Sequence, residues 1–149
     1  MLNGVLLRKL SALDQTLSEL RSLGRVSAAQ LSADWRTRRA VERDLQVLVE
    51  IVIDVCQRIL ALAGQAPAAT GAEAVERCIA LEVLAPKDAY RRMVQFRNFV
   101  VHRYEQVEVA VLVDIVNDRL DDFGGFRSEV LRYAEGQSGG SHGGPRQSA

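Results

Sequence analysis

Hydrophobic residues recur every three or four positions along most of the chain, which is the spacing of one face of an α-helix. No stretch alternates between hydrophobic and polar residues clearly enough to predict a β-strand. The pattern predicts five helices, over about 2–23, 32–63, 72–83, a fourth that opens at residue 87 and carries residues 97–104, and 107–120. After a break at residues 121–125, a last turn or two is expected up to residue 135. The chain is therefore predicted to be all-α.

Residues that stop or start helices separate these segments. Gly24 and Gly64 follow the first and second helices, and Pro86 ends the third helix and opens the fourth. Ser32 is expected to cap the long second helix. Because short loops favour antiparallel neighbours, we expect an up-and-down bundle of four main helices with one minor helix.

The last 14 residues have a different composition. Residues 136–149 read GQSGGSHGGPRQSA and contain no hydrophobic residue that could pack except the final alanine. The sequence predicts a helical domain over residues 1–135 and a disordered tail over residues 136–149. His142 is assigned to this tail and to no site.

Composition and charge restrict the classes of function that the chain can have. With 149 residues and 48% hydrophobic residues, the chain can fill a core without metals or disulfides. Its 19 basic and 19 acidic residues balance, so any contact with nucleic acid must come from a local patch. Cys56 and Cys78 have no metal-ligand spacing and are expected to be buried thiols in a reducing cytoplasm. We expect no cofactor and no metal, and neither a signal peptide nor a membrane span.

One arginine occupies an unexpected position in the fourth helix. Arg97 falls within a hydrophobic stripe where a leucine would be expected. The other members of the stripe are Tyr90, Met93, Val94, Val100, Val101 and Tyr104. His102 is rotated from Arg97 by about 140° around the helix, so the two can flank a groove but cannot share one regular face. A guanidinium in such a stripe needs either an ionic partner or a wet cleft.

The second helix offers acidic partners. Glu50 and Asp54 are four residues apart in a hydrophobic stretch and so share a helix face, which Gln46 extends by one turn. One interpretation is a buried ion pair between Arg97 and either carboxylate that fixes the register of two helices. The other is an anion-binding cleft in which these carboxylates support the site and hold Arg97 in place.

His102 and Asn98 give the region its possible chemistry. A histidine near a helix end is often solvated, but an imidazole can exchange a proton at neutral pH while a nearby arginine stabilises negative charge. This combination suits phosphate chemistry. RNA transesterification needs both a base and an acid, and a two-fold dimer would bring two such histidines together.

A tryptophan and several arginines stand at the beginning of the second helix. Trp35 is expected to pack in the core. The neighbouring arginines are interpreted first as a solvated face and second as a basic patch for phosphates or an acidic partner. They are Arg36, Arg38, Arg39 and Arg43.

The octapeptide RNFVVHRY resembles the R-N-x-x-x-H-x-Y form of a motif in HEPN-domain proteins, specifically the HepT toxins that are encoded beside the minimal nucleotidyltransferase antitoxin MntA. The resemblance extends to AVERDLQVLVEIVIDV at residues 40–55 and to PKDAYRRMVQFRN before the motif. Together these segments place most of residues 1–135 within the resemblance.

The resemblance implies an all-α homodimer with two motifs facing one cleft, cytoplasmic location and metal-independent endoribonuclease activity of a type VII-like toxin–antitoxin system. Arg97 and His102 would be catalytic, Asn98 would orient the site, and Tyr104 would receive AMP from the antitoxin. The RNA substrate, tRNA or mRNA, is not fixed by the motif. Two other hypotheses remain: a non-catalytic module that binds a nucleotide or the nucleotidyltransferase, and a structural bundle in which Arg97 only forms an ion pair.

Overall fold

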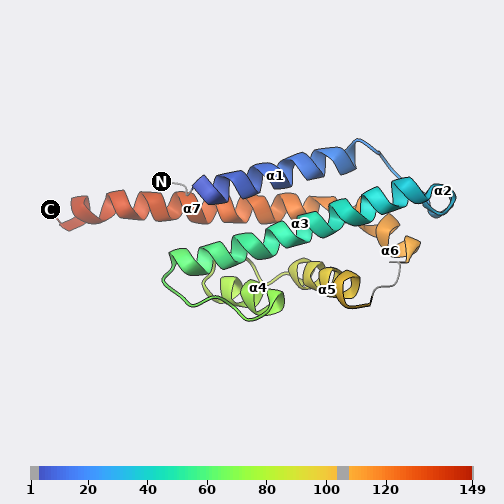
Figure 1. The fold of residues 1–149 in the computed structure, drawn as a ribbon. Coiled ribbons are helices and arrows are strands. Elements are labelled where there is room, and N and C mark those ends of the chain that lie inside the picture. Colours follow the sequence, from blue (N-terminus) through green and yellow to red (C-terminus); the bar gives the residue numbers. More distant parts are fainter. Residues whose placement is uncertain (1–3, 104–107, 149) are drawn as a thin grey trace.

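The long helix α3 (Trp35–Leu62) lies at the centre of the fold and packs against helices on both of its sides (Figure 1). This computed structural model describes the backbone of residues 4–103 and 108–148, and the side chains of residues 4–98 and 108–136. The other elements are α1 (Gly4–Arg21), α2 (Ala28–Ala33), α4 (Gly71–Ala80), α5 (Asp88–Arg103), α6 (Val109–Asp114), a π-helical turn η1 (Ile115–Arg119) and α7 (Leu120–Ser148).

The four long helices alternate in direction. α1 and α7 lie along one side of α3, while α4 and α5 lie along the other (Figure 1). The described residues contain no strand. The predicted all-α bundle is therefore confirmed, with α1, α3, α5 and α7 as its main helices.

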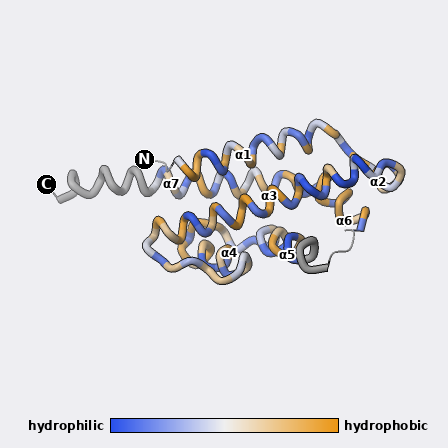
Figure 2. Tube along the Cα trace, viewed as in Figure 1, coloured by the Kyte–Doolittle hydropathy of each residue, from blue (hydrophilic) through white to orange (hydrophobic). Residues whose placement is uncertain are grey.

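The core is built from the hydrophobic stripes of these helices. Along α3 the buried positions recur at helical spacing from Val41 to Leu60, whereas the first turns of α3 are mainly hydrophilic (Figure 2). Gly64 ends α3 with a φ of 75°, a conformation in which a side chain would be strained. No helix within the described residues combines the length and hydrophobicity needed to cross a bilayer.

The final helix differs from the sequence prediction. The predicted break at residues 121–125 is wrong, because α7 runs through Gly124 and Gly125 without interruption. Burial of Phe123, Phe126 and Val130, each at most 3% exposed, outweighs a helical cost of about 1 kcal/mol for each glycine. The end of α7 projects beyond the bundle (Figure 1), and the predicted domain boundary at residue 135 stays a prediction.

The start of α3 also differs. The predicted cap at Ser32 is wrong, because Ser32 lies inside the short helix α2, whose cap is Ser27. Asp34 caps α3 instead, and its carboxylate accepts hydrogen bonds from the Thr37 hydroxyl at 2.7 Å and from the Arg36 amide at 3.1 Å. The hydrogen bond from the Thr37 side chain is the main cause that lowers the pKa of Asp34.

Glu129 fixes the beginning of α5 against α7. Its carboxylate accepts hydrogen bonds from the Tyr90 hydroxyl and from the Ala85 amide, and it forms an ion pair with Lys87 at 3.2 Å. The Tyr90 ring also packs edge-on against Phe126 of α7. Burial, together with the hydrogen bond to Glu129, raises the pKa of Tyr90 well above its usual value. These contacts determine where α5 lies on the bundle.

Asn117 of η1 holds the loop before α2 in place through two hydrogen bonds. The Asn117 amide accepts a hydrogen bond from the Val26 N–H at 2.9 Å and donates one to the Val26 carbonyl at 2.8 Å. Val26 is buried, so water cannot replace these bonds. The π-helical turn thus has a structural role, since it presents Asn117 to a segment 91 residues away in sequence.

Replacing Asn117 by alanine is expected to lower the free energy of unfolding by about 2 kcal/mol, because two buried backbone groups lose their partners. Urea unfolding followed by circular dichroism measures this loss. Asp118→Ala in the same turn is the matched control, because the Asp118 ion pair with Arg25 is exposed and long at 3.7 Å. Equal unfolding midpoints for the two variants would refute the role of Asn117.

Candidate functional site

The candidate site lies on α5, whose hydrophobic stripe is fixed in the core. Tyr90, Met93, Val94 and Phe96 are all buried. These contacts set the rotation of the helix and thereby place Arg97 at the edge of the buried surface. Arg97 is half-buried, as its position in the hydrophobic stripe predicted.

Arg97 lacks the partners that a buried cation requires. Its Nε is buried and has no hydrogen-bond partner among the described residues. No ion pair of Arg97 occurs among the described side chains either. A buried guanidinium nitrogen without a partner is costly, so this position calls for a ligand or a partner group outside the described residues.

The hypothesis that Arg97 pairs with Asp54 or Glu50 is wrong for this structure. Asp54 is exposed and pairs with Lys9 of α1 at 3.1 Å, while Glu50 accepts a hydrogen bond from Gln46 at 3.1 Å. The reason is the register of the antiparallel helices. A groove brings Phe96 and Met93 of α5 together with Leu45 of α3, so Arg97 is level with residues near 42 rather than 50–54.

Two other polar side chains occupy that level of α3. Arg38 and Glu42 form a partly buried ion pair at 3.9 Å, with side chains 17% and 15% exposed. The Arg38 Nε and the Glu42 Oε1 are buried, and neither has a hydrogen-bond partner among the described residues. Val49 lines the groove together with Leu45. Glu42 is seven residues before Val49, two helical turns, so Glu42 lies on the same face of α3, which is turned to α5.

Glu42 was not among the site residues predicted from the sequence. The seven-residue spacing to Val49 is a signal that could have identified it. This part of the α3–α5 surface thus has three buried polar atoms that form no hydrogen bond among the described residues. They belong to Arg38, Glu42 and Arg97. Such a group is suited to receive a ligand or a second protein surface.

The other motif residues are described only in part. Asn98 is exposed and follows Arg97 directly. His102 lies in the last turn of α5, but its side chain lies outside the described side chains. Tyr104 lies outside the described residues. The roles predicted for Asn98, His102 and Tyr104 stay predictions.

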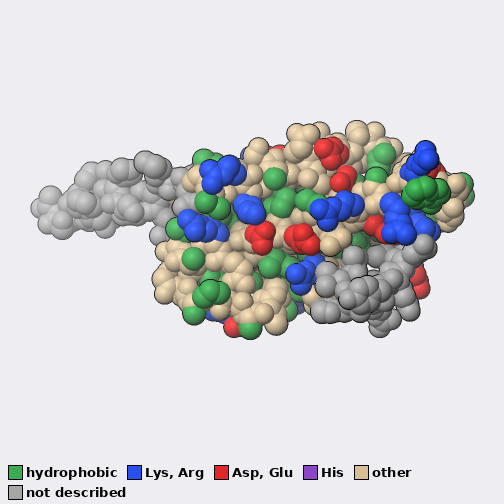
Figure 3. All heavy atoms as spheres, viewed as in Figure 1, with side chains coloured by type: hydrophobic (Ala, Val, Ile, Leu, Met, Phe, Trp, Pro, Cys, Tyr) green, Lys and Arg blue, Asp and Glu red, His purple; other side chains and the backbone are tan. Residues whose placement is uncertain are grey.

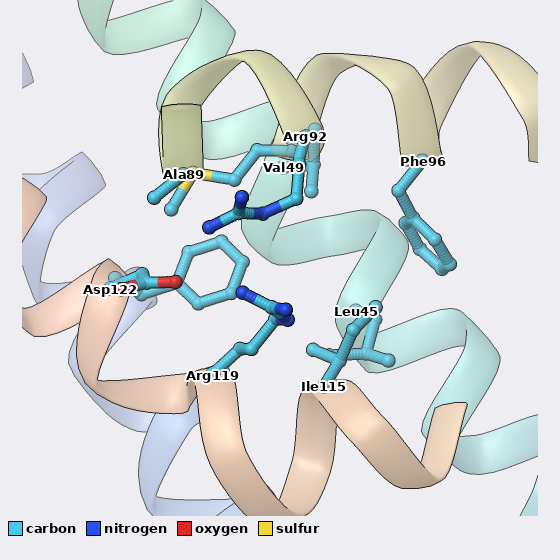
Figure 4. Close-up of a pocket in the computed structure, with 10 residues that line it drawn as sticks. Leu45, Val49, Ala89, Arg92, Phe96, Ile115, Arg119 and Asp122 are labelled. Atoms are coloured by element: carbon cyan, nitrogen blue, oxygen red, sulfur yellow. The ribbon is translucent and has the colours of Figure 1, made fainter. Parts of the chain in front are cut away.

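A groove opens between α5 and the η1–α7 segment (Figure 4). Arg92 and Arg119 extend into it from opposite walls, with Asp122 at one end and Phe96 and Ile115 at the other. The cavity volume is about 40 Å³. It adjoins a wider hollow of about 420 Å³ that shares Arg92, Phe96, Ile115 and Arg119.

The beginning of α3 carries a basic surface. The expectation that Trp35 packs in the core is wrong, because its side chain is 63% exposed and the Arg36 guanidinium lies 5.4 Å from its ring centre. Trp35 stands at the first residue of α3, before the first buried position of the helix, so no neighbour covers it. Lys and Arg side chains gather over this end of α3 (Figure 3). Exposed arginines beside an aromatic ring suit the phosphates and bases of a single-stranded nucleic acid.

The cysteines and the acidic residues give no evidence of other chemistry. Cys56 and Cys78 are buried free thiols, as predicted, and the Cys78 sulfur lies 3.5 Å from the Cys56 carbonyl oxygen. The hydrogen bond with Cys78 and burial raise the pKa of Cys56, which keeps this thiol protonated. The described residues hold no cluster of three or more His, Cys, Asp or Glu side chains that could bind a metal ion.

Comparison with known families identifies the chain. A model of the family described as "Ribonuclease HepT-like" matches residues 13–130. The chain belongs to the HepT-like family. The family resemblance predicted from RNFVVHRY is therefore confirmed.

Solved structures share the fold of this HepT-like chain. A tri-AMPylated Shewanella oneidensis HEPN toxin in complex with an MNT antitoxin has a TM-score of 0.79 and 19% sequence identity, over 88% of this chain and 99% of that one. A toxin–antitoxin complex with AMP-PNP has a TM-score of 0.78 and 18% identity, over 87% and 99%. A mutant MntA–HpeT complex has a TM-score of 0.76, with the same identity and coverage. None of the curated protein sequences that were compared matches the chain.

Proposed function

We propose that this HepT-like chain is the toxin of an HEPN/MNT toxin–antitoxin system and that it cleaves RNA without a metal ion. The observation that carries this proposal is Arg97, a half-buried cation whose Nε lacks a partner among the described residues, in the R-N-x-x-x-H-x-Y motif of a HepT-like chain. The toxins in the solved complexes with the same fold support it. Because RNA is the substrate, the site of action is the cytoplasm.

The proposed reaction is a transesterification. The RNA 2′-oxygen attacks the adjacent phosphorus, one His102 takes the proton from the 2′-hydroxyl, and a second His102 donates a proton to the 5′-oxygen that leaves. The products are a 2′,3′-cyclic phosphate and a 5′-hydroxyl end. Arg97 stabilises the negative charge that grows on the phosphoryl oxygens in the transition state. Asn98, the residue after Arg97, would orient the substrate or the catalytic side chains.

The second histidine comes from a second copy of the chain. One protomer contributes a single motif histidine, whereas the reaction needs a base and an acid at one phosphate. A two-fold dimer with both α5 helices at one cleft would provide them. The unused polar atoms of Arg38, Glu42 and Arg97 support such an arrangement, because a second surface or a substrate could complete their hydrogen bonds.

The substrate contact surface extends beyond the motif. The exposed Trp35 ring and the arginines that follow it lie on the N-terminal turns of α3, and the antiparallel register places the end of α5 at the same level. A base can stack on an exposed ring while guanidinium groups bind phosphates. A local basic surface of this kind accounts for RNA binding by a chain with no net charge. Both tRNA and mRNA fit this chemistry.

The test of the proposed function is cleavage of cellular RNA by the purified chain in the presence of EDTA. Wild-type protein is expected to produce discrete fragments with 5′-hydroxyl ends, because no step uses a metal. Mass measurement in solution is expected to show a dimer. Absence of cleavage at high protein concentration, or cleavage that EDTA abolishes, would contradict the proposal.

We further propose that the partner nucleotidyltransferase silences the toxin by modifying Tyr104. The tyrosine oxygen would attack the α-phosphorus of ATP, with pyrophosphate as the leaving group, and the bound AMP would add bulk and negative charge beside the site. Co-expression with an MNT-type nucleotidyltransferase is expected to increase the intact mass in AMP-sized steps. Tyr104→Phe is expected to lose every step, whereas Tyr133→Phe keeps them. Equal modification of both variants would refute the assignment.

The balanced charge also favours a second candidate function, a non-catalytic module that binds the nucleotidyltransferase. In that case Arg97 and Tyr104 belong to a docking surface. Growth arrest on expression without the antitoxin, relieved by Arg97→Ala, would exclude this alternative.

A further inference from the structure

The solvent-facing side of α3 changes its charge along the helix. Arg36, Arg39 and Arg43 are exposed near the beginning of α3, and helical counting places them within about 60° of one line. Glu50 continues this line seven residues after Arg43, and Asp54 follows one turn later. This side of α3 is therefore basic over its first turns and acidic from Glu50 onward, although the whole chain has no net charge.

No acidic side chain neutralises the three exposed arginines by direct contact. None of them forms an ion pair among the described residues, whereas Arg38 pairs with Glu42. The nearby Asp34 carboxylate already accepts hydrogen bonds from the first amides of α3 and from the Thr37 hydroxyl. Asp44 is half-buried, and burial is the main cause that raises its pKa. The exposed guanidinium groups are thus available to bind an anion.

An aromatic ring stands at the basic end of α3. Trp35 is the first residue of the helix, its side chain is exposed, and the Arg36 guanidinium lies over its ring (Figure 3 shows the Lys and Arg side chains gathered here). Proteins that bind single-stranded nucleic acids stack bases on exposed aromatic rings and hold the phosphates with basic side chains. The combination on α3 therefore indicates a ligand that has both flat rings and phosphates.

The spacing of the arginines fits a short stretch of one strand. Arg36 and Arg43 are seven residues apart, which is about 10.5 Å along the helix axis. Stacked nucleotides follow one another at about 3.4 Å, so this distance covers roughly three nucleotide steps. The Glu50 carboxylate would repel the phosphates of a longer stretch. A duplex offers no unpaired base to Trp35, so this surface can distinguish single strands from double strands.

We propose that Trp35 and the three exposed arginines form a binding track for unpaired RNA. One base stacks on Trp35, and the arginines bind the phosphates of about three neighbouring nucleotides. That this RNA is the substrate rests on the proposed function, and the track restricts the substrate class to RNA with an unpaired segment, such as a loop or a tail. Arg97 lies level with residues near 42, so the track runs from the level of the motif helix toward the first residue of α3. It supplies binding and no catalytic group.

The test uses RNA whose riboses carry 2′-O-methyl groups, so that no 2′-hydroxyl can attack. Trp35 is the only tryptophan of the chain, so tryptophan fluorescence reports directly on the track. A single strand of about 12 nucleotides is expected to quench this fluorescence, whereas a blunt duplex of the same sequence is expected to leave it unchanged. Affinity should rise with strand length up to about four nucleotides and then level off, because the track ends at Glu50.

Anisotropy of a fluorescein-labelled single strand measures what each group contributes. Trp35→Ala is expected to raise the Kd about tenfold, the scale of one stacked base, whereas Trp35→Phe keeps most of the affinity. Arg39→Gln and Arg43→Gln should each raise the Kd and make its salt dependence shallower by a slope of about 0.7. Glu50→Gln should lower the Kd, because it removes the repulsion at the acidic end. Arg132→Gln is the matched control, since Arg132 is exposed on α7, outside the track.

The outcomes separate the track from the proposed function. Cleavage by the wild type, with an unchanged Kd in Trp35→Ala and Arg39→Gln, would overturn the track and leave the ribonuclease intact. Affinity that depends on Trp35 and Arg39 in a chain that cleaves no RNA would support the track and refute the ribonuclease. Equal quenching by the single strand and the duplex would overturn the selection of unpaired RNA. If Arg39→Gln converts the dimer to a monomer, this side of α3 is an interface between copies of the chain and the track is overturned.

Discussion

His102→Ala is expected to reduce RNA cleavage by about 10²- to 10⁴-fold, the range that general acid–base catalysis contributes. In the proposed reaction the same residue serves as base in one protomer and as acid in the other. One substitution therefore removes both proton transfers from the dimer. The fall should appear in kcat, because the variant keeps the basic surface of α3 that is proposed to bind the RNA.

The chain provides its own control for this measurement. It has two histidines, and His142 lies in the last residues of the sequence, outside the motif. His142→Ala is expected to cleave cellular RNA at the wild-type rate. Both purified variants are compared with wild type in EDTA, with circular dichroism as a check of folding. Equal cleavage by His102→Ala and wild type would exclude His102 from catalysis.

Arg97→Met is expected to lower cleavage by about 10²- to 10³-fold and to leave the fold equally stable or more stable. The activity falls because no group then offsets the charge on the phosphoryl oxygens. The stability does not fall, because the Arg97 Nε is buried without a partner among the described residues, and methionine fills similar space without a polar atom. A gain of about 1 kcal/mol in the free energy of unfolding is the expected scale.

Arg58→Met separates the two effects. The Arg58 Nε is also buried without a described hydrogen-bond partner, but Arg58 lies in the last turns of α3, away from the level of Arg97. In urea unfolding, the stability of this variant should change in the same direction as that of Arg97→Met. Its RNA cleavage should equal that of the wild type. If Arg97→Met stabilises the fold and cleaves RNA normally, the chain is a structural bundle and Arg97 has no catalytic role.

The helices were predictable because their signals are local. Hydrophobic residues at helical spacing indicate each helix, and Gly24, Gly64 and Pro86 indicate where helices end. Each of these signals acts within its own segment, and the bounds of the main helices agree closely with the predicted ones. The errors arose where distant contacts decide. Gly124 and Gly125 usually end helices, but here the hydrophobic side chains around them are buried, and the helix continues. Trp35 was expected to pack in the core, whereas its place at the first residue of α3 leaves it exposed.

The candidate site was predictable to a similar extent. The motif and the odd place of Arg97 in a hydrophobic stripe could be recognised in the sequence, and Arg97 lies half-buried on α5, as helical counting predicted. The polar residues of α3 that lie level with Arg97 could not be predicted, because the spacing of Glu50 and Asp54 shows only that these two share a face of α3. Which level of α3 meets α5 depends on how the whole bundle packs. That packing brings Arg97 to the level of Glu42 and turns Asp54 to Lys9 of α1.

The sequence by itself determined that this protein is an all-α chain of the HepT-like kind, because helical periodicity and the RNFVVHRY motif are written within single segments. The tertiary structure alone decided what surrounds the motif. It showed that the proposed ion pair of Arg97 does not form, that Asn117 clamps a distant loop, and that Arg92 and Arg119 face one groove. These features join residues from different helices, and their geometry follows from the packing of side chains across the bundle, which no local pattern contains.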